Sequence, residues 1–116
     1  MSLRELDPKT VHDAVQAGSA VIIDVREPRE FATERLHGAS LHPLSTFDPQ
    51  SIPVDKTRDV ILQCGSGKRS MDALQRCEAA GVAITAHLKG GLMAWKAAGL
   101  PTVTIDPATG QVIDPK

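Results

Sequence analysis

The sequence predicts an α/β domain with a central, mainly parallel sheet between layers of helices. Two short apolar runs, residues 20–23 and 60–63, have the length and composition of strands that are buried on both faces. A helical pattern follows each run, and strands that alternate with helices are typical of a parallel sheet. The 116 residues suit one domain, which we place at residues 1–101, followed by a tail or small hairpin at 102–116.

The first half of the chain contains two predicted helices around the first strand. Asp7 followed by Pro8 is typical of an N-cap and the first position of a helix, and Gly18 is placed to end that helix. The strand follows directly, and Pro28 can begin a short second helix. From there to the second strand, the many prolines and aspartates indicate turns, a brief extended piece and a short helix within an irregular loop.

The second half of the chain repeats the strand and helix pattern. After the second strand, apolar residues spaced three to four apart predict a helix over 69–80, which Gly81 caps. A third apolar run predicts a strand over 82–88. A tight turn then leads into a last helix that ends before Pro101 and carries Trp95 as a core residue.

Composition and charge argue against several classes of protein. The net charge of −1 gives no overall field that would favour nucleic acid. No apolar run approaches the roughly 18 residues of a membrane helix, and the N-terminus lacks the apolar core of a signal peptide. Two cysteines are too few for a disulfide framework, so we expect a cytoplasmic location. Neither belongs to a Cys-x-x-Cys pair and the four histidines are scattered, so we expect no metal site and no cofactor.

The loop after the second strand has the clearest chemistry, in the run Cys64-Gly65-Ser66-Gly67-Lys68-Arg69-Ser70. Gly65 and Gly67 free the backbone, so that successive N–H groups can point inward at an anion. The positive end of the following helix and the charges of Lys68 and Arg69 strengthen the same field. Each feature favours a thiolate at Cys64, which is the nucleophilic form of cysteine. The loop also lies at the carboxyl end of a strand, where parallel sheets bind ligands.

A cysteine in this setting can act as a phosphatase nucleophile, a sulfur carrier or a redox thiol. A disulfide with Cys77 is excluded, because the eight or so helical residues from Arg69 to Cys77 span roughly 12 Å. We expect Cys77 to be a buried helix residue. Four residues separate Cys64 from Arg69, whereas cysteine-dependent phosphatases have one more, which makes a ring wide enough for phosphate. The smaller ring suits the single extra sulfur atom of a persulfide.

Five motifs follow one another along residues 5 to about 101: Asp24-Val25-Arg26-Glu27-Pro28 with Glu30-Phe31, His37-Gly38-Ala39, the loop that begins at Cys64, Gly90-Gly91 with Trp95, and Gly99-Leu100-Pro101. Together they resemble the single-domain rhodaneses, which are sulfurtransferases. The resemblance implies a rhodanese-like three-layer α/β/α fold and a persulfide intermediate on Cys64. It also implies transfer of sulfur from a small anionic donor such as thiosulfate to cyanide, a thiol or an acceptor protein.

We also expect roles for single residues, of which the role of Asp24 and Arg26 is implied by the resemblance. Gly65, Ser66, Gly67 and Ser70 would bind substrate or shape the loop. Lys68 would either contact substrate or be a solvated loop lysine, and Arg69 would either orient an anionic substrate or brace the loop. Asp24 and Arg26 would mainly support the fold through an ion pair, and His37 would pack in a turn.

Several alternatives stay open at this level. The start of the loop, Cys64-Gly65-Ser66-Gly67, is similar to the mercaptopyruvate-using branch, so the donor is undecided. The chain is also similar to the cytosolic module of rhodaneses tethered by two membrane helices, which implies either a soluble relative or a segment trimmed before those helices. A cysteine-dependent phosphatase or arsenate reductase, and a non-catalytic interaction module, are the other candidate functions.

Overall fold

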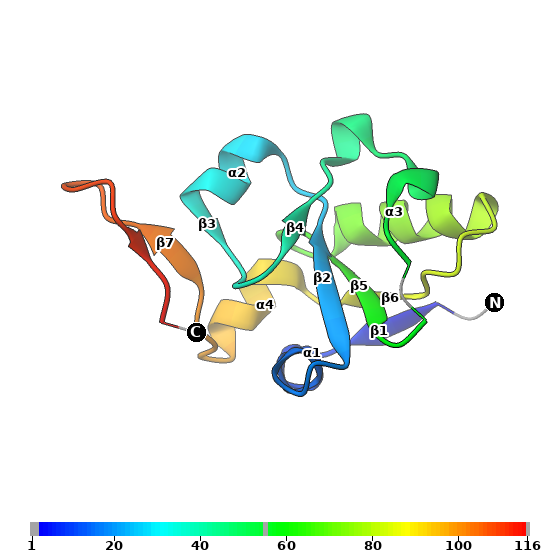
Figure 1. Ribbon diagram of the computed structural model, residues 1–116, viewed down its shortest axis with the longest axis horizontal. Helices are drawn as coiled ribbons and strands as arrows, with labels where there is room; N and C mark the ends of the chain where they lie inside the picture. The colour runs from blue at the N-terminus through cyan, green and yellow to red at the C-terminus, as the bar shows by residue number, and fades with distance from the viewer. Residues whose placement is uncertain (1–2, 55, 116) are drawn as a thin grey trace.

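The computed structural model describes residues 3–54 and 56–115, which form a five-stranded and a three-stranded sheet with helices packed around the larger one (Figure 1). The strands are β1 (Arg4–Leu6), β2 (Ala20–Asp24), β3 (Glu34–Arg35), β4 (Ser40–Leu41), β5 (Asp59–Gln63), β6 (Ala86–Leu88), β7 (Val103–Ile105) and β8 (Val112–Ile113). The α-helices are α1 (Pro8–Gln16), α2 (Pro28–Thr33), α3 (Lys68–Ala79) and α4 (Gly91–Ala97), and the short 3-10 helices are η1 (Leu44–Thr46) and η2 (Pro49–Ser51).

The larger sheet is parallel throughout and has the strand order β1-β6-β5-β2-β4. Its side chains alternate between two cores, as the continuous apolar runs predict for strands covered on both faces. Ile22 and Ile61 pack in the core that contains residues of α1 and α4, whereas Ile23 and Leu62 pack in the core that contains residues of α3. The predicted α/β fold with a central parallel sheet is confirmed.

The first helix begins as its sequence predicts. Asp7 is the N-cap, and its carboxylate accepts a hydrogen bond of 2.8 Å from the Thr10 N–H, while Pro8 occupies the first helical position. The chain leaves the helix through Gly18, whose positive φ of 74° requires glycine or strain. The chain then enters β2 directly after this turn.

The predicted strand over 82–88 is wrong in its first half. Only Ala86–Leu88 pairs with its neighbours β5 and β1. The preceding residues form an irregular link in which Val82 and Ile84 are buried in the same core as α3. The apolar residues of this run are there because they are buried beneath a helix. Such residues give the same sequence pattern as a buried strand.

The edge strand β1 was not predicted from the sequence. Its three residues, Arg4–Leu6, pair on one side only, with β6. An edge strand that is largely exposed has no need of an apolar run, and charged residues protect such an edge against pairing with another chain. This strand places Glu5 at the edge of the larger sheet, next to a buried histidine of β6 that is described below.

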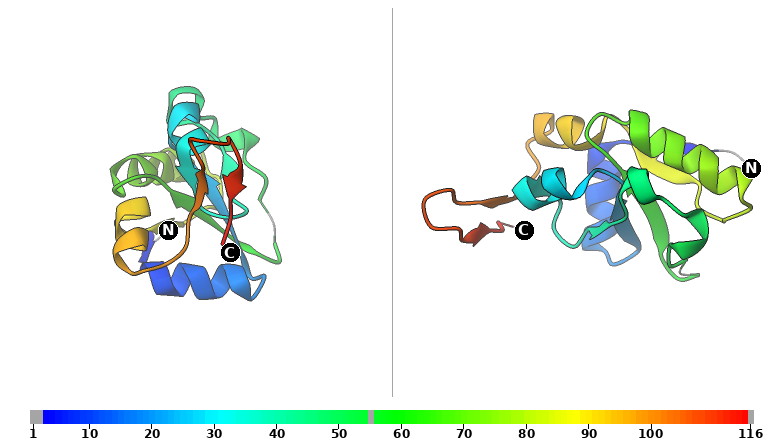
Figure 2. Two further views of the ribbon diagram at one scale, coloured as in Figure 1. Left: turned by 90° about the vertical axis from the view of Figure 1, so that its left-hand side faces the viewer. Right: turned by 90° about the horizontal axis from the view of Figure 1, so that it is seen from above.

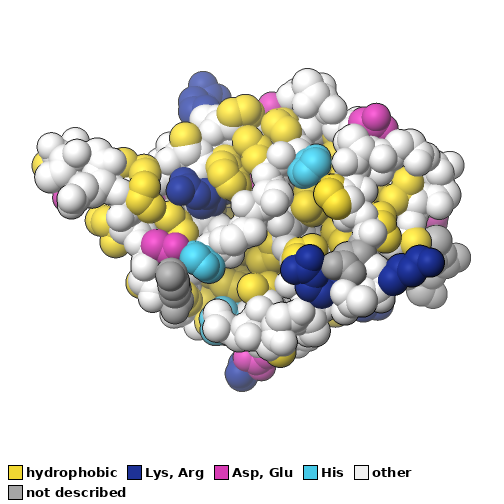
Figure 3. Space-filling model, viewed as in Figure 1, with side chains coloured by type: hydrophobic (Ala, Val, Ile, Leu, Met, Phe, Trp, Pro, Cys, Tyr) yellow, Lys and Arg dark blue, Asp and Glu magenta, His cyan; other side chains and the backbone are white. Residues whose placement is uncertain are grey.

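The C-terminal segment forms a hairpin in which β7 pairs antiparallel with both β3 and β8. Figure 2 shows that this hairpin extends away from the central sheet. Asp114 at its end is hydrogen-bonded to the imidazole of His37. On the face shown in Figure 3, charged side chains lie in small separate groups among apolar ones. The placement of a domain boundary at residue 101 stays a prediction.

The helices of this fold are short. Among the described residues, none is both long and apolar enough to cross a bilayer.

Candidate active site

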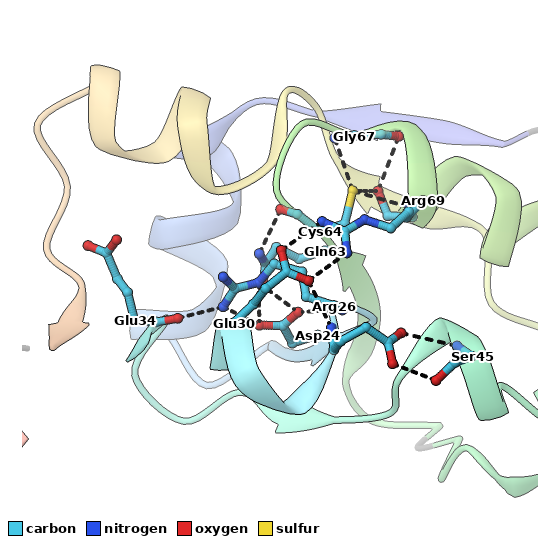
Figure 4. Close-up of polar contacts among 11 residues, drawn as sticks. Asp24, Arg26, Glu30, Glu34, Ser45, Gln63, Cys64, Gly67 and Arg69 are labelled. Atoms are coloured by element: carbon cyan, nitrogen blue, oxygen red, sulfur yellow. Dashed lines mark hydrogen bonds and ion pairs between the residues drawn. The ribbon is translucent and has the colours of Figure 1, made fainter. Parts of the chain in front are cut away.

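Cys64 lies immediately after β5, at the carboxyl end of the central strand, and its sulfur faces the beginning of α3 (Figure 4). The Gly67 N–H donates to Sγ at 3.0 Å and the Ser70 N–H at 3.3 Å. Gly67 is the N-cap residue of the helix and has a φ of 99°, a conformation that favours glycine. The cysteine sulfur therefore occupies the place of a capping side chain and satisfies N–H groups at the positive end of the helix.

This environment favours the thiolate form of Cys64. Burial alone would raise the pKa of the thiol. Hydrogen bonds from the Ser70 hydroxyl and from the N–H groups of Ser70, Gly67 and Ser66 oppose that effect and prevail, so the pKa lies below the ordinary cysteine value. Burial raises the pKa of Cys77, which lies in the apolar core beneath α3. The two thiols thus differ in the way that separates a nucleophile from a structural cysteine.

The beginning of α4 fixes the backbone of the loop from the other side. The Leu92 N–H donates to the Cys64 carbonyl at 2.8 Å, and the Met93 N–H donates to the Gly65 carbonyl at 3.0 Å. A Cβ on Gly91 would lie 2.4 Å from the Cys64 carbonyl oxygen, so no other residue fits there without moving the loop. The side chain of Gln63 also donates to the Cys64 carbonyl, at 2.8 Å.

Arg69 folds back over the loop and is bound by Glu30 of α2 through two hydrogen bonds, Nη1 to Oε1 at 2.7 Å and Nη2 to Oε2 at 2.9 Å (Figure 4). The hydrogen bonds from Arg69 lower the pKa of Glu30 to about 2. A Cβ on Gly65 would lie 3.3 Å from the guanidinium, which shows how closely Arg69 covers the loop. Of the two roles expected for Arg69, this geometry favours bracing of the loop.

Asp24 and Arg26 form a buried ion pair at the carboxyl end of β2, beside the loop. Arg26 donates to both carboxylate oxygens of Asp24 and, at 2.6 Å, to the carbonyl of Glu34. This arrangement ties β2 to the chain around β3, and no hydrogen bond joins the pair to the Cys64 sulfur. These contacts are those that a supporting pair would make, and the supporting role that the resemblance implies stays a prediction.

The remaining loop residues lie at different depths, with Ser66 and Lys68 forming the outer rim of the site. Ser66 and Lys68 are exposed, while Ser70 is buried beside the sulfur, with its hydroxyl oxygen 3.5 Å from Sγ. Within residues 3–54 and 56–115, no group of three or more histidine, cysteine or acidic side chains could hold a metal ion. The site is thus a buried cysteine sulfur that accepts hydrogen bonds from backbone N–H groups, with the cationic side chains of Lys68 and Arg69 toward the surface.

Sequence reasoning missed three residues around this site. Glu30 was part of a motif but was not identified as the partner of Arg69. His87 and Glu5 were not connected with the loop at all, although the imidazole of His87 contacts the Ser70 hydroxyl. The contacts join residues 39, 17 and 82 positions apart, and no local pattern marks such pairs.

The chain is similar to known proteins over most of its described length. A sulfurtransferase of Allochromatium vinosum is 28% identical over 102 residues, which cover 87% of this chain and 95% of that protein. An uncharacterized protein of Synechocystis is 45% identical over 96 residues, which cover 83% of this chain and 54% of that protein, so the chain spans about half the length of that relative.

Solved structures show the same fold. The crystal structure of a rhodanese-related protein from Thermoplasma volcanium superposes with a TM-score of 0.74 at 22% identity, covering 86% of this chain and 97% of that one. Residues 7–98, which contain the loop, match the family described as Rhodanese-like domain. The chain therefore belongs to the rhodanese-like family.

Proposed function

We propose that this protein is a sulfurtransferase that carries sulfur as a persulfide on Cys64. The observation that carries the proposal is the position of Sγ, 3.0 Å from the Gly67 N–H and 3.3 Å from the Ser70 N–H at the start of a helix. These donors lower the pKa of the thiol. The same N–H groups are suited to stabilise the negative charge of a terminal persulfide sulfur.

The first half of the proposed reaction loads the cysteine. The Cys64 thiolate attacks the outer sulfur of a donor such as thiosulfate and forms a new S–S bond. The S–S bond of thiosulfate breaks, and sulfite leaves with its electron pair. The positive charges of Lys68 and Arg69 favour a small anionic donor. Lys68 is exposed at the rim and is free of the Glu30 clamp, so it is the better candidate for the first contact.

The second half transfers the sulfur to an acceptor. Cyanide, a thiol or the cysteine of an acceptor protein attacks the outer sulfur of the persulfide. The S–S bond breaks, and its electron pair returns to Sγ of Cys64 as a thiolate. The N–H groups that favour the thiolate in the resting enzyme also stabilise this leaving group.

The burial of the sulfur favours sulfur chemistry over phosphate chemistry. Cys64 is 0% exposed beneath its own loop, and four residues separate it from Arg69. A single terminal sulfur needs only one position inside the ring of N–H donors. A phosphate brings three peripheral oxygens, each of which needs a donor about 3 Å away.

The test is mass spectrometry of the intact protein after incubation with thiosulfate. We expect one added sulfur atom that cyanide removes as thiocyanate. Cys64→Ser should abolish both steps, whereas Cys77→Ala should load normally. Loading of the Cys64→Ser variant, or hydrolysis of phosphate esters by the natural chain faster than sulfur transfer, would refute the proposal.

A further inference from the structure

A continuous row of hydrogen bonds leads from the buried sulfur of Cys64 to the surface. The Ser70 hydroxyl oxygen lies 3.5 Å from Sγ and 2.7 Å from Nδ1 of His87. Nε2 of the same imidazole lies 3.1 Å from Oε2 of Glu5. Ser70 and His87 are buried, at 0% and 1% exposure, while the side chain of Glu5 is 50% exposed. The row crosses from β5 through α3 and β6 to the edge strand β1.

The Ser70 hydroxyl has one hydrogen, which links the protonation states on its two sides. When Cys64 is a thiol, its S–H can donate to the Ser70 oxygen, and the hydroxyl then donates to Nδ1 of His87. When Cys64 is a thiolate, the Ser70 hydroxyl donates to sulfur, and its oxygen can then accept from a protonated Nδ1. The Gly67 carbonyl, 3.3 Å from the Ser70 oxygen, is the more distant alternative acceptor.

We propose that Ser70, His87 and Glu5 form a proton relay for Cys64. The proton leaves Sγ for the Ser70 oxygen as the Ser70 hydrogen moves to Nδ1 of His87. Two protons each move across one hydrogen bond, so the net products are a thiolate and an imidazolium. Ser70 regains its hydroxyl hydrogen, and no atom is oxidised or reduced. Nε2–H of the imidazolium donates to the Glu5 carboxylate, which compensates its buried charge.

The relay acts on the cysteine of the proposed function. Its use in sulfur transfer therefore rests on that proposal. Before loading, it removes the proton that would block attack by Cys64 on the donor. During release, the Ser70 hydroxyl donates to Sγ as the S–S bond breaks and the electron pair returns. Ser70 contacts the reacting sulfur directly, whereas His87 and Glu5 act through it as positioning residues.

Other charged groups face the two ends of the relay. Around the sulfur, α3 contributes the exposed Lys68 and also Arg69, which α2 holds through Glu30, and β2 contributes the Asp24–Arg26 pair. Because the pKa of Glu30 is about 2, the clamp does not change its charge near neutral pH. At the Glu5 end, Asp7 follows β1 and Lys89 follows β6, and these two charges attract each other.

The experiment measures the alkylation rate of Cys64 by iodoacetamide against pH, with Cys77→Ala as the background so that one thiol reacts. Ser70→Ala should raise the pKa of Cys64 by about one unit, the value of a hydrogen bond to a charged group. His87→Gln and Glu5→Gln should each raise it by a few tenths of a unit. Asp72→Asn removes a carboxylate that pairs with Arg76 on α3, and should leave the profile unchanged.

The decisive measurement is a double-mutant cycle. If His87 and Glu5 act through the serine, neither His87→Gln nor Glu5→Gln should shift the pKa of Cys64 further once Ser70 is alanine. Shifts that add in the double variants, or no shift in Glu5→Gln, would overturn the relay. If His87→Gln does not fold, the half-exposed Glu5 completes the cycle with Ser70 alone.

Alkylation needs no sulfur donor, so the two proposals fail separately. If the double variants show no further shift in the pKa of Cys64 but the protein loads no sulfur, the relay stands and the sulfurtransferase proposal is overturned. If the protein loads sulfur but the shifts in the pKa of Cys64 add in the double variants, the sulfurtransferase proposal stands and the relay is overturned.

Discussion

At Gly91, the methyl group of an alanine should push the loop that begins at Cys64 away from α4. A Cβ at this residue would lie 2.4 Å from the Cys64 carbonyl oxygen and 2.6 Å from the Gly65 carbonyl carbon, whereas ordinary contacts begin at 3.4 Å. In Gly91→Ala, the loop and α4 must therefore separate by about 1 Å. This weakens the hydrogen bonds from Leu92 and Met93 to the loop carbonyls, each worth roughly 1 kcal/mol.

Gly99→Ala is the matched control. Gly91 and Gly99 both have positive φ, 61° and 76°, so alanine is strained at either position by roughly 1 kcal/mol. A Cβ on Gly99 meets nothing within 4 Å. We expect Gly99→Ala to lower the free energy of unfolding by about 1 kcal/mol, and Gly91→Ala by about 2–4 kcal/mol because the hydrogen bonds are weakened as well.

The assay is the initial rate of thiocyanate formation from thiosulfate and cyanide, at a temperature where circular dichroism shows both variants folded. A displacement of about 1 Å in catalytic geometry costs roughly a hundredfold in rate, so Gly91→Ala should fall by that factor. Gly99→Ala should retain the rate of the natural chain. Equal rates in the two folded variants would refute the reasoning that α4 positions the cysteine.

Three further predictions concern the charged clamp and the second cysteine. Glu30→Gln should lower the free energy of unfolding by about 1 kcal/mol at neutral pH, since solvent screens this partly exposed pair. Because the pKa of Glu30 is lowered from 4.5 to about 2, the difference should be complete above pH 4.5 and vanish toward pH 2 in urea titrations; a difference that grows in acid would contradict it. Arg69→Ala should raise the pKa of Cys64 more than Lys68→Ala, because Arg69 interacts electrostatically with the sulfur, and alkylation against pH measures both. Cys77→Ala should cost about 1–2 kcal/mol of stability through its cavity yet retain turnover in the thiocyanate assay; loss of activity in the folded variant would show that this thiol takes part.

The sequence by itself determined the α/β architecture and identified Cys64 as the candidate nucleophile. Continuous apolar runs at β2 and β5 predict strands buried on both faces, because each residue of such a strand packs against one layer of helices or the other. Two glycines and two basic residues after Cys64 predict an N–H cradle, because the conformations they require are local. These signals lie within a few residues of one another, so they can be recognised without the fold.

The tertiary structure alone decided how the site is held and how it connects to solvent. Glu30 and Gly91 lie far from the loop in sequence and meet it only because α2 and α4 pack beside it. The sequence left Arg69 open between substrate binding and bracing, and its two hydrogen bonds to Glu30 favour bracing. His87 and Glu5 join the site only because β6 and β1 are neighbours in the parallel sheet. Such pairings depend on strand order, which hydrophobic periodicity does not encode, since every buried strand of a parallel sheet has the same pattern.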